Sequence, residues 1–290
     1  MVKLQSYRDR LLGELDGLAE QYTALLNAST IGAHNWDSGF IGFPHYYWVD
    51  SSPELQAVRM DLLASVRDLE PRIRLLFPHP TPEVSSVLKE SFGLLRRWAK
   101  RGRGDHSIPR SIEQAITTML QSLTDLKALS EMLPDDEWPK RLVVDTNTLI
   151  DNPNLAAHTS TLGRRYMVHV LPVVLGELDD LKRAGRTPEL REAAKKADRR
   201  LKALRDNGDV RVGARVQGDV HAVFEHVEPR DDGLPSWLNL DVPDDRLVAS
   251  SLLLQSARPG STVYVATGDL NLQNKLAAVG LPFVELHSGG

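Results

Sequence analysis

The chain has 290 residues, enough for two domains, and its 41% hydrophobic and 26% charged content is typical of a soluble globular protein. No apolar run reaches the roughly 18 residues needed to cross a bilayer, and the absence of cysteine excludes disulfides, thiolate metal sites and cysteine nucleophiles. The net charge of −4 excludes a simple, strongly basic nucleic-acid-binding protein. The N-terminal residues show no signal-peptide core, so we expect a cytoplasmic protein.

Residues 1–135 have the pattern of an all-helical domain. Leucines in residues 4–26 recur at three- and four-residue spacings, which places them on one face of a helix. Further helices are expected from Pro53 to about Phe77, from Pro82 to Lys100 and from Ile108 to Leu133. We interpret the Gly- and aromatic-rich residues 31–50 as an ordered loop or short hairpin. The role of this domain stays open between regulation, dimerisation and substrate positioning.

A boundary follows at residues 133–140, where the sequence LPDDEWPK combines two prolines with a run of acids. Beyond it, strand and helix patterns alternate, which predicts a doubly wound parallel sheet with flanking helices over residues 140–287. Strands are expected at 142–144, 167–170, 262–266 and 282–286, with weaker candidates at 210–212 and 222–227. Helices are expected at 172–183, 188–206, 244–256 and 270–279.

Two of the expected strands end in an aspartate. Asp145 comes directly after Leu-Val-Val, and Asp269 follows Tyr-Val-Ala after a Thr-Gly pair. Ligands of open α/β sheets bind beyond the carboxyl ends of the strands, and a bound cation would offset the cost of placing carboxylates there. The competing interpretation is that each aspartate only caps the helix that follows it. Two such acids at equivalent positions leave both interpretations open.

The sequence around these acids resembles the PIN-domain nuclease family. RLVVDTNTLID at 141–151 is similar to the family's opening motif with its first acid, Asp145, and VHVLPVVLGELDDL at 168–181 matches the second, with Glu177 on the helix. The third motif, D-x-x-[IV]-A, is matched by DRLVA from Asp245, and the fourth, T-x-D-x-[DN], by TGDLN around Asp269. The resemblance covers about residues 140–287 and does not extend to residues 1–135.

The resemblance implies a metal-dependent nuclease. Asp145, Glu177, Asp245 and Asp269 would bind Mg²⁺ or Mn²⁺ and form the catalytic site, because hard divalent cations prefer carboxylate oxygens and assist phosphodiester hydrolysis. Residues expected to orient these ligands, or in one case to join them, are Asn147, Thr267 and Asn271.

Two acids near these motifs have ambiguous roles. Asp244 and Asp245 are adjacent, and only one of them can point into the site. We choose Asp245 from its spacing to Val248-Ala249, and assign Asp244 as the helix N-cap. Asp180 shares a helix face with Glu177, but solvated surface is the favoured interpretation.

A basic segment lies between the second and third motifs. Residues 182–205 contain ten lysines and arginines against three acids. A charge run is often only a solvated helix face, but this one follows the helix that carries Glu177, where cations would attract a phosphate backbone. The residues expected to bind nucleic acid are Arg183, Arg186, Lys195, Lys196, Arg199 and Arg200.

Two features of the helical domain have a second interpretation. Arg101 and His106 resemble the R-x4-H motif of a helical ribonuclease family, in a match too short to assign a second catalytic site. Aromatic residues in the 31–50 segment are suited to stacking on bases, although packing within a small loop is favoured. These aromatic residues are Phe40, Phe43, Tyr46, Tyr47 and Trp48.

The leading prediction is a Mg²⁺- or Mn²⁺-dependent endoribonuclease that acts on single-stranded RNA and binds no membrane. A DNA-directed or structure-specific nuclease with the same site is an alternative, because no residue in the sequence is assigned to read a 2′-hydroxyl. A non-catalytic PIN-like scaffold that binds RNA or protein is another. A homodimer and an antitoxin-like partner stay open, and the long N-terminal extension makes a small toxin less natural.

Overall fold

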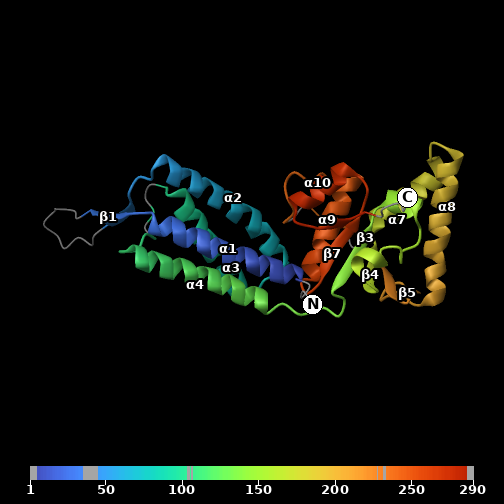
Figure 1. Cartoon of the computed structure of the whole chain (residues 1–290), viewed down its shortest axis with the longest axis horizontal. Helices are drawn as coiled ribbons and strands as arrows, with labels where there is room; N and C mark the ends of the chain where they lie inside the picture. The colour runs from blue at the N-terminus through green and yellow to red at the C-terminus, as the bar shows by residue number, and fades with distance from the viewer. Residues whose placement is uncertain are drawn as a thin grey trace. The chain divides into compact units, whose positions relative to one another are not determined.

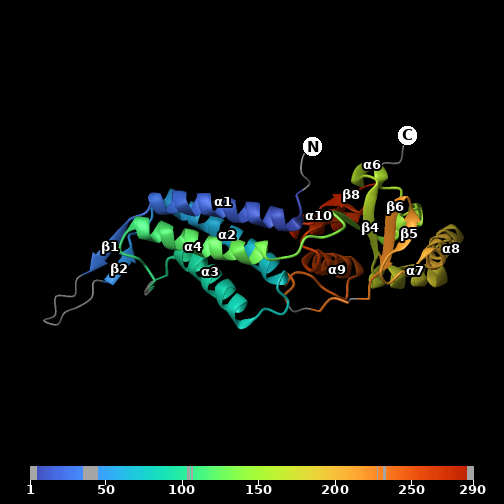
Figure 2. The same ribbon diagram turned by 90° about the horizontal axis from the view of Figure 1, so that it is seen from below.

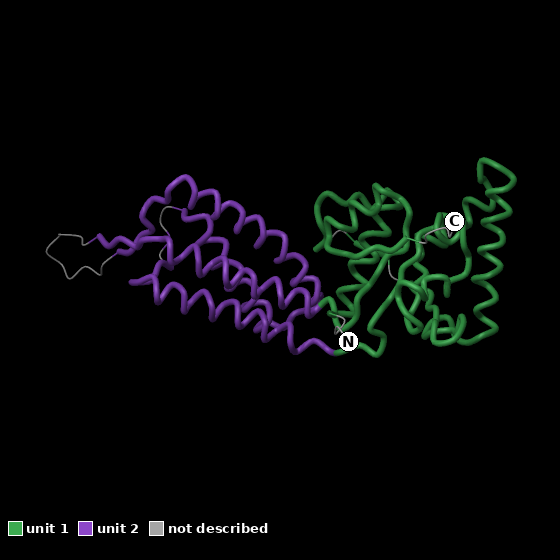
Figure 3. Tube along the Cα trace, viewed as in Figure 1, with its two compact units in different colours: residues 1–7, 135–290 green, residues 8–134 purple. Residues whose placement is uncertain are grey.

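The computed structural model describes residues 5–34, 45–102, 105, 107–226, 228–230 and 233–285. The chain divides into two compact units (Figure 3). The first unit in chain order is residues 8–134, purple and labelled unit 2 in Figure 3, and the second is residues 1–7 together with 135–290, green and labelled unit 1. The described residues before position 8 join the second unit through hydrogen bonds. Tyr7 N–H donates to Ser261 O at 3.1 Å, and Thr262 Oγ1 donates to Gln5 O at 3.0 Å. The sequence pattern gave no sign of this connection.

The first unit is built from four long helices that run side by side (Figures 1 and 2). They are α1 (Tyr7–Asn27), α2 (Pro53–Leu75), α3 (Pro82–Lys100) and α4 (Ile112–Glu131). Their apolar faces meet in a core that includes Leu11, Leu62, Phe92, Trp98 and Met119, all at most 1% exposed. The helical prediction for this half of the chain is confirmed.

The bundle helices begin where hydroxyl side chains cap them. Ser52 Oγ accepts from the backbone N–H of Leu55, and Ser111 Oγ accepts from that of Gln114. Pro53 follows the first of these caps, as the sequence pattern predicts. The cap at Ser111 explains why α4 begins at Ile112, four residues later than expected.

Strands β1 (Ile31–His34) and β2 (His45–Trp48) pair antiparallel, with Ile31 opposite Trp48 and His34 opposite His45. This antiparallel pairing agrees with the short hairpin, one of the two alternatives expected for residues 31–50. Trp48 packs edge-on against Trp98, with ring centroids 5.9 Å apart, so part of the aromatic segment contributes to packing. Phe40, Phe43 and His106 lie outside the described residues.

The second unit contains a six-stranded sheet in the order β5-β6-β4-β3-β7-β8. Its strands are β3 (Lys140–Val144), β4 (Arg165–Val170), β5 (Ala214–Gln217), β6 (Asp219–Phe224), β7 (Thr262–Ala266) and β8 (Phe283–Val284). All pairs are parallel except β5 with β6. This mostly parallel sheet with helices confirms the predicted fold class.

Helices cover both faces of this sheet. They are α5 (Thr146–Asp151), α6 (Thr159–Leu162), α7 (Pro172–Ala184), α8 (Pro188–Ala203), the 3₁₀ helix η1 (Leu204–Asn207), α9 (Pro243–Ala257) and α10 (Leu270–Ala278). Helices α7 and α8 lie on one face and α9 and α10 on the other (Figure 1). From β3 the chain moves along the sheet to β4 and β6, and it then crosses back to β7, on the other side of β3. Because crossovers between parallel strands are right-handed, the helices that connect strands in these two directions lie on opposite faces of the sheet.

The sheet edges differ from the sequence prediction. Residues 210–212, a weak strand candidate, form a turn between Gly208 and Gly213, which both have positive φ, and Val212 is 77% exposed. The edge strand is β5, and β6 begins three residues earlier than the expected start at 222. The short last strand, β8, falls within the range expected for it. Sheet edges are set by pairing with a neighbour, which local patterns do not show.

Candidate functional site

The carboxyl ends of β3 and β7 lie side by side at the point where the strand order reverses. Val144 pairs with Ala266, and Asp145 N–H donates to Ala266 O at 3.1 Å. Asp145 therefore leaves the sheet beside the segment that leads to Asp269. This is the position where open α/β sheets bind their ligands.

Both aspartates cap the helix that follows them. Asp145 Oδ1 accepts from Thr148 N–H at 2.6 Å, and Asp269 Oδ1 accepts from Leu272 N–H at 2.9 Å. The capping interpretation of the sequence is therefore correct for each residue. It accounts for one oxygen of each carboxylate, and among the described residues no hydrogen bond reaches the Oδ2 atoms. Capping and ligand binding are compatible, because each needs a different oxygen.

A cavity of about 390 Å³ opens beside these two aspartates. Its walls come from the starts of α5, α9 and α10 and from the middle of α7, and five of its side chains are carboxylates. The lining residues are Asp145, Thr146, Asn147, Glu177, Asp180, Leu181, Pro243, Asp244, Leu247, Asp269 and Leu272. Three of the four predicted acids thus line one cavity, together with two acids that the sequence reasoning assigned elsewhere.

Glu177 is held in the cavity by a hydroxyl that the sequence reasoning did not single out. Thr146 Oγ1 donates to Glu177 Oε2 at 2.6 Å, from a threonine that is itself buried. Burial raises the pKa of Glu177, and the charges of Asp244 and Asp145 add to this rise, while the bond from Thr146 opposes it. The position of Thr146 directly after the strand-end aspartate is the only sequence signal for its role.

The third acid differs from the prediction. Asp245 is turned away from the cavity: Lys275 Nζ lies 2.6 Å from its Oδ1, and its Oδ2 accepts from Asn239 N–H at 2.9 Å. Burial alone would raise the pKa of Asp245, but Lys275 and Asn239 together lower it.

Asp244 takes the place in the cavity that the sequence reasoning gave to Asp245. Asp244 is not the N-cap of α9 either, because that position is held by Val242. Burial raises the pKa of Asp244, and the charge of Asp269 adds to this rise, while Lys275, with Nζ 3.9 Å from Asp244 Oδ2, opposes it. Successive residues of a helix point about 100° apart, so only one of two adjacent acids can face the cavity.

The three residues expected to support the acids lie in different surroundings. Asn147 is exposed and lines the cavity. Thr267 is buried, and its Oγ1 accepts from Asp269 N–H at 3.1 Å, which fixes the turn that carries the acid. Asn271 is exposed and is not part of the cavity wall.

The donor set of the cavity fits a hard divalent cation. All of its charged side chains are carboxylates. Burial, with a smaller contribution from neighbouring carboxylates, raises the pKa of Glu177 and that of Asp244. Within the described part of the chain, no group of three carboxylate or imidazole side chains is placed to hold an ion directly. Mg²⁺ commonly keeps several water ligands and takes only one or two carboxylates, so the cavity suits a hydrated ion.

The predicted basic residues lie on α7, on α8 and in the loop between these helices, and none of them lines the cavity. Helix α8 packs against α5 and α7, which both contribute to the cavity wall. All six basic residues named in the prediction are exposed. Lys195 is paired with Glu192 at 2.7 Å, whereas Lys196 and Arg200 have no ion-pair partner among the described residues.

Comparisons with known proteins identify the second unit. Among the described residues, no helix is both long and apolar enough to span a membrane. A search of curated proteins finds no match, and the N-terminal part has no family match. Residues 142–287, half of the chain, match a family model described as the PIN domain. This family consists generally of nucleases, its members typically use divalent metals, and the domain implies nucleic-acid binding. The match and the sheet with its acidic cavity together place the protein in the PIN-domain family.

Proposed function

We propose that the protein is a metal-dependent endoribonuclease that hydrolyses RNA phosphodiester bonds. Asp145, Glu177, Asp244 and Asp269 would hold Mg²⁺ or Mn²⁺, with Asp244 in place of Asp245. The observation that carries the proposal is the cavity in which these acids gather at the ends of β3 and β7. The PIN-domain match supports nuclease chemistry in general, and RNA as substrate is the finer step.

The chain's own residues bind and orient in this mechanism. When bound, the metal ion neutralises charge on the phosphate and lowers the pKa of the attacking water. The caps of α5 and α10 hold Asp145 and Asp269 so that Oδ2 of each is available. Thr146 fixes the Glu177 carboxylate from inside the protein. Leu181, Leu247 and Leu272 line the same cavity and limit the access of bulk water.

The basic surface on α7 and α8 would hold the substrate backbone. Its residues are Arg183, Arg186, Lys195, Lys196, Arg199 and Arg200, and contact with phosphates makes binding weaken as salt rises. We expect replacement of Lys195, Lys196, Arg199 and Arg200 by glutamate to weaken RNA binding at low salt and to reduce its salt dependence. Because these side chains are exposed, the fold should be retained.

A cleavage assay with purified protein tests the proposal. Labelled single- and double-stranded RNA and DNA of one sequence are incubated with Mg²⁺, with Mn²⁺ or with EDTA. We expect metal-dependent cleavage within single-stranded RNA. Asp145→Asn keeps the acceptor for Thr148 N–H but removes the negative charge, so cleavage should fall by roughly 10²–10³-fold.

Asp151→Asn is the matched control, because Asp151 is an exposed acid at the end of the same helix. Equal activity of Asp145→Asn and Asp151→Asn would refute the assignment of the site. Cleavage of DNA in preference to RNA would keep the site and change the substrate. RNA binding without cleavage of any substrate would favour a non-catalytic scaffold. The observation that supports this alternative is that, among the described residues, no three acidic or imidazole side chains are grouped to hold a metal ion.

A further inference from the structure

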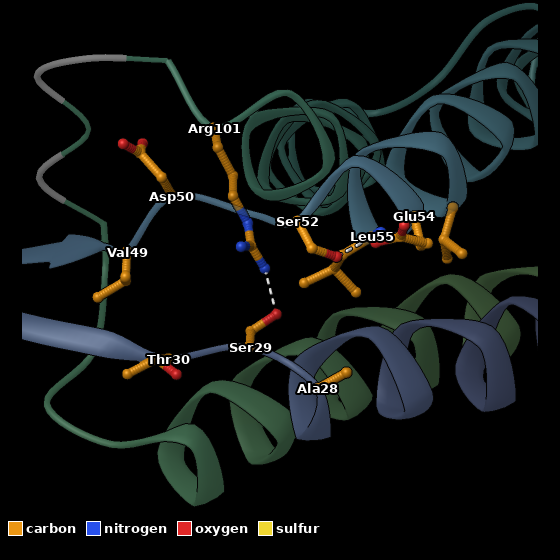
Figure 4. A pocket seen from close by; sticks show the side chains of 10 residues that line it. Ala28, Ser29, Thr30, Val49, Asp50, Ser52, Glu54, Leu55 and Arg101 are labelled. Atoms are coloured by element: carbon orange, nitrogen blue, oxygen red, sulfur yellow. Dashed lines mark hydrogen bonds between the residues drawn. The ribbon is translucent and has the colours of Figure 1, made fainter.

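A second cavity, of about 320 Å³, lies in the helical unit (Figure 4). It is formed where α1 ends, α2 begins, α3 reaches its C-cap and the chain leaves β2. Its wall combines one arginine, two acids and several small polar and apolar side chains. The lining residues that matter here are Ser29, Val49, Leu55, Val58 and Arg101.

Two arginines meet beside this cavity, and one of them, Arg101, lines it. Arg101 Nη1 and Arg59 Nη1 both donate to Ser51 Oγ, each at 3.1 Å. Arg101 Nη2 also donates to Ser29 Oγ, across the cavity from α3 (Figure 4). The guanidinium of Arg101 lies over the ring of Trp48, 4.4 Å from its centroid. Two cationic groups therefore meet at a single hydroxyl group.

Their charge is not balanced by a carboxylate. Among the described residues, neither Arg59 nor Arg101 forms an ion pair, and the buried Arg101 Nε has no hydrogen-bond partner. The Asp50 carboxylate points away from the guanidinium of Arg101 (Figure 4). Glu54 interacts with its own backbone N–H and with Ser52, which lowers its pKa. Burial, with the nearby charge of Arg59, lowers the pKa of Arg101 to about 10. An anion in the cavity would relieve this cost.

The backbone of Arg101 gives a second, independent sign of function. This residue is the C-cap of α3 in the left-handed conformation, with φ of 51°. It is the only non-glycine residue with positive φ in the part of the chain that the structure describes. Glycine adopts this conformation with less strain, so an arginine here keeps its guanidinium in place at a conformational cost. Strained residues of this kind gather at ligand sites.

We propose that this cavity binds a nucleoside phosphate, either free or at the end of an RNA strand. Arg101 would bind the phosphate, because a planar guanidinium group matches its oxygens well. Arg59 would add positive charge beside the cavity, because its own guanidinium is held by Ala99 O, Lys100 O and Ser51 Oγ. Val49, Leu55 and Val58 would provide an apolar wall for the ribose and base. The cavity volume is at the lower end of the range of about 300–1,000 Å³ for small-molecule sites, which suits one nucleotide. The site does not depend on the acidic cavity of the second unit.

Binding to the full chain in EDTA tests the proposal without any cleavage. The probes are AMP and a short 5′-phosphorylated oligoribonucleotide, each compared by calorimetry with its counterpart that lacks the phosphate. We expect the phosphorylated probes to bind at least about tenfold more tightly, and Arg101→Gln to remove most of that difference. Arg67→Gln is the matched control, because it makes the same change at an exposed arginine of α2 that does not line the cavity.

A second pair of variants covers the case in which Arg101→Gln fails to fold. Val58 is 45% exposed on α2 and lines the cavity, so Val58→Glu should fold normally while its charge repels a phosphate. Val58→Gln matches it in size without the charge and should bind like the unmodified protein. Equal binding of probes with and without phosphate, or undiminished binding by Val58→Glu, would overturn the proposal. Equal affinity for AMP and the phosphorylated strand would identify free nucleotide as the ligand, and tighter binding of the strand would identify a strand end.

Discussion

The second unit contains two clusters of charged side chains that differ in how their charges are balanced. One cluster joins Asp136, Arg141, His169 and Glu225, and every member contacts a partner of complementary character. The other is the acidic cavity, whose charged lining residues, Asp145, Glu177, Asp180, Asp244 and Asp269, are all carboxylates. The first cluster balances its charges within the protein, whereas the lining of the second cavity contains no cationic side chain.

The geometry of the balanced cluster fixes its proton positions. Arg141 Nη1 lies 2.9 Å from His169 Nε2, and arginine can only donate, so Nε2 accepts and the proton is on Nδ1. Nδ1 then donates to Glu225 Oε1 at 2.7 Å. Burial lowers the pKa of His169, which agrees with a neutral ring. Arg141 Nη2 donates to both oxygens of Asp136, at 2.7 and 2.9 Å.

The largest effect on stability is expected from breaking the balanced cluster. Asp136→Asn leaves Arg141 buried without its counterion and should lower the free energy of unfolding by about 3 kcal/mol, measured by urea denaturation. Glu137→Gln is the control, because Glu137 is paired with Arg165 at the exposed surface and should cost less than about 0.5 kcal/mol. Similar losses in both variants would show that the buried cluster has no special role.

A smaller effect, on activity, is expected from Thr146→Val. This change removes the donor to Glu177 with little change in shape, so cleavage should fall by roughly tenfold. The pKa of Glu177 should rise further, which moves the rising limb of the pH–rate profile to higher pH. Thr146→Ser keeps the hydroxyl and should retain most of the activity. If Thr146→Ser is as impaired as Thr146→Val, packing rather than the hydrogen bond is responsible.

Asp244 and Asp245 should respond in opposite directions. In metal-free protein at pH 7, Asp244→Asn removes a charge that burial and neighbouring carboxylates disfavour. Because the Asp244 side chain is 44% exposed and solvent screens its charge, the free energy of unfolding should rise by less than about 0.5 kcal/mol. Asp245→Asn removes the partner of Lys275 and should lower it by about 1–2 kcal/mol. Only Asp244→Asn should also weaken Mn²⁺ binding, measured by calorimetry. Weaker Mn²⁺ binding in Asp245→Asn alone would restore the assignment made from the sequence.

The smallest effect is a difference in pH dependence. The folded-state pKa values of Glu177 and Asp244 are raised, so their destabilising charge is present at neutral pH and disappears as pH falls through those values. The stability gained by the double variant Glu177→Gln/Asp244→Asn should therefore vanish at low pH. Asp136 has a lowered pKa, because the bonds from Arg141 outweigh its burial. The loss in Asp136→Asn should be full at neutral pH and should shrink as pH falls from the ordinary carboxylate value towards the lowered pKa of Asp136. Thermal unfolding from pH 7 down to about pH 2 measures both.

The sequence predicted the fold and the strand-end acids because both depend on local patterns. Buried strands alternate with amphipathic helices, and an aspartate that caps a helix after such a strand can be recognised from its neighbours. The first and last acids, Asp145 and Asp269, therefore lie where they were expected, at the ends of β3 and β7.

The remaining features depend on contacts between distant segments. The choice between Asp244 and Asp245 is made by Lys275, which comes from α10 and is thirty residues away in the sequence. The support of Glu177 by Thr146 joins α7 to α5. The edge strand β5 forms through pairing with β6, after a turn whose valines resemble a strand. A single sequence shows none of these partners.

The connection of residues 5–7 to the second unit has a practical consequence for dissecting the protein. A fragment cut to the family match at residue 142 would lack Gln5 and Tyr7, and also the Asp136–Arg141 pair. It would also uncover the backbone at Gly260, which packs against the backbone of Asp135 and Asp136. These segments are so close that a Cβ added at Gly260 would lie 2.5 Å from Asp136 N. The smallest fragment that keeps these contacts is therefore discontinuous in sequence. Joining residues 1–7 to residue 135 through a short flexible linker should yield a more protease-resistant fragment than the simple truncation.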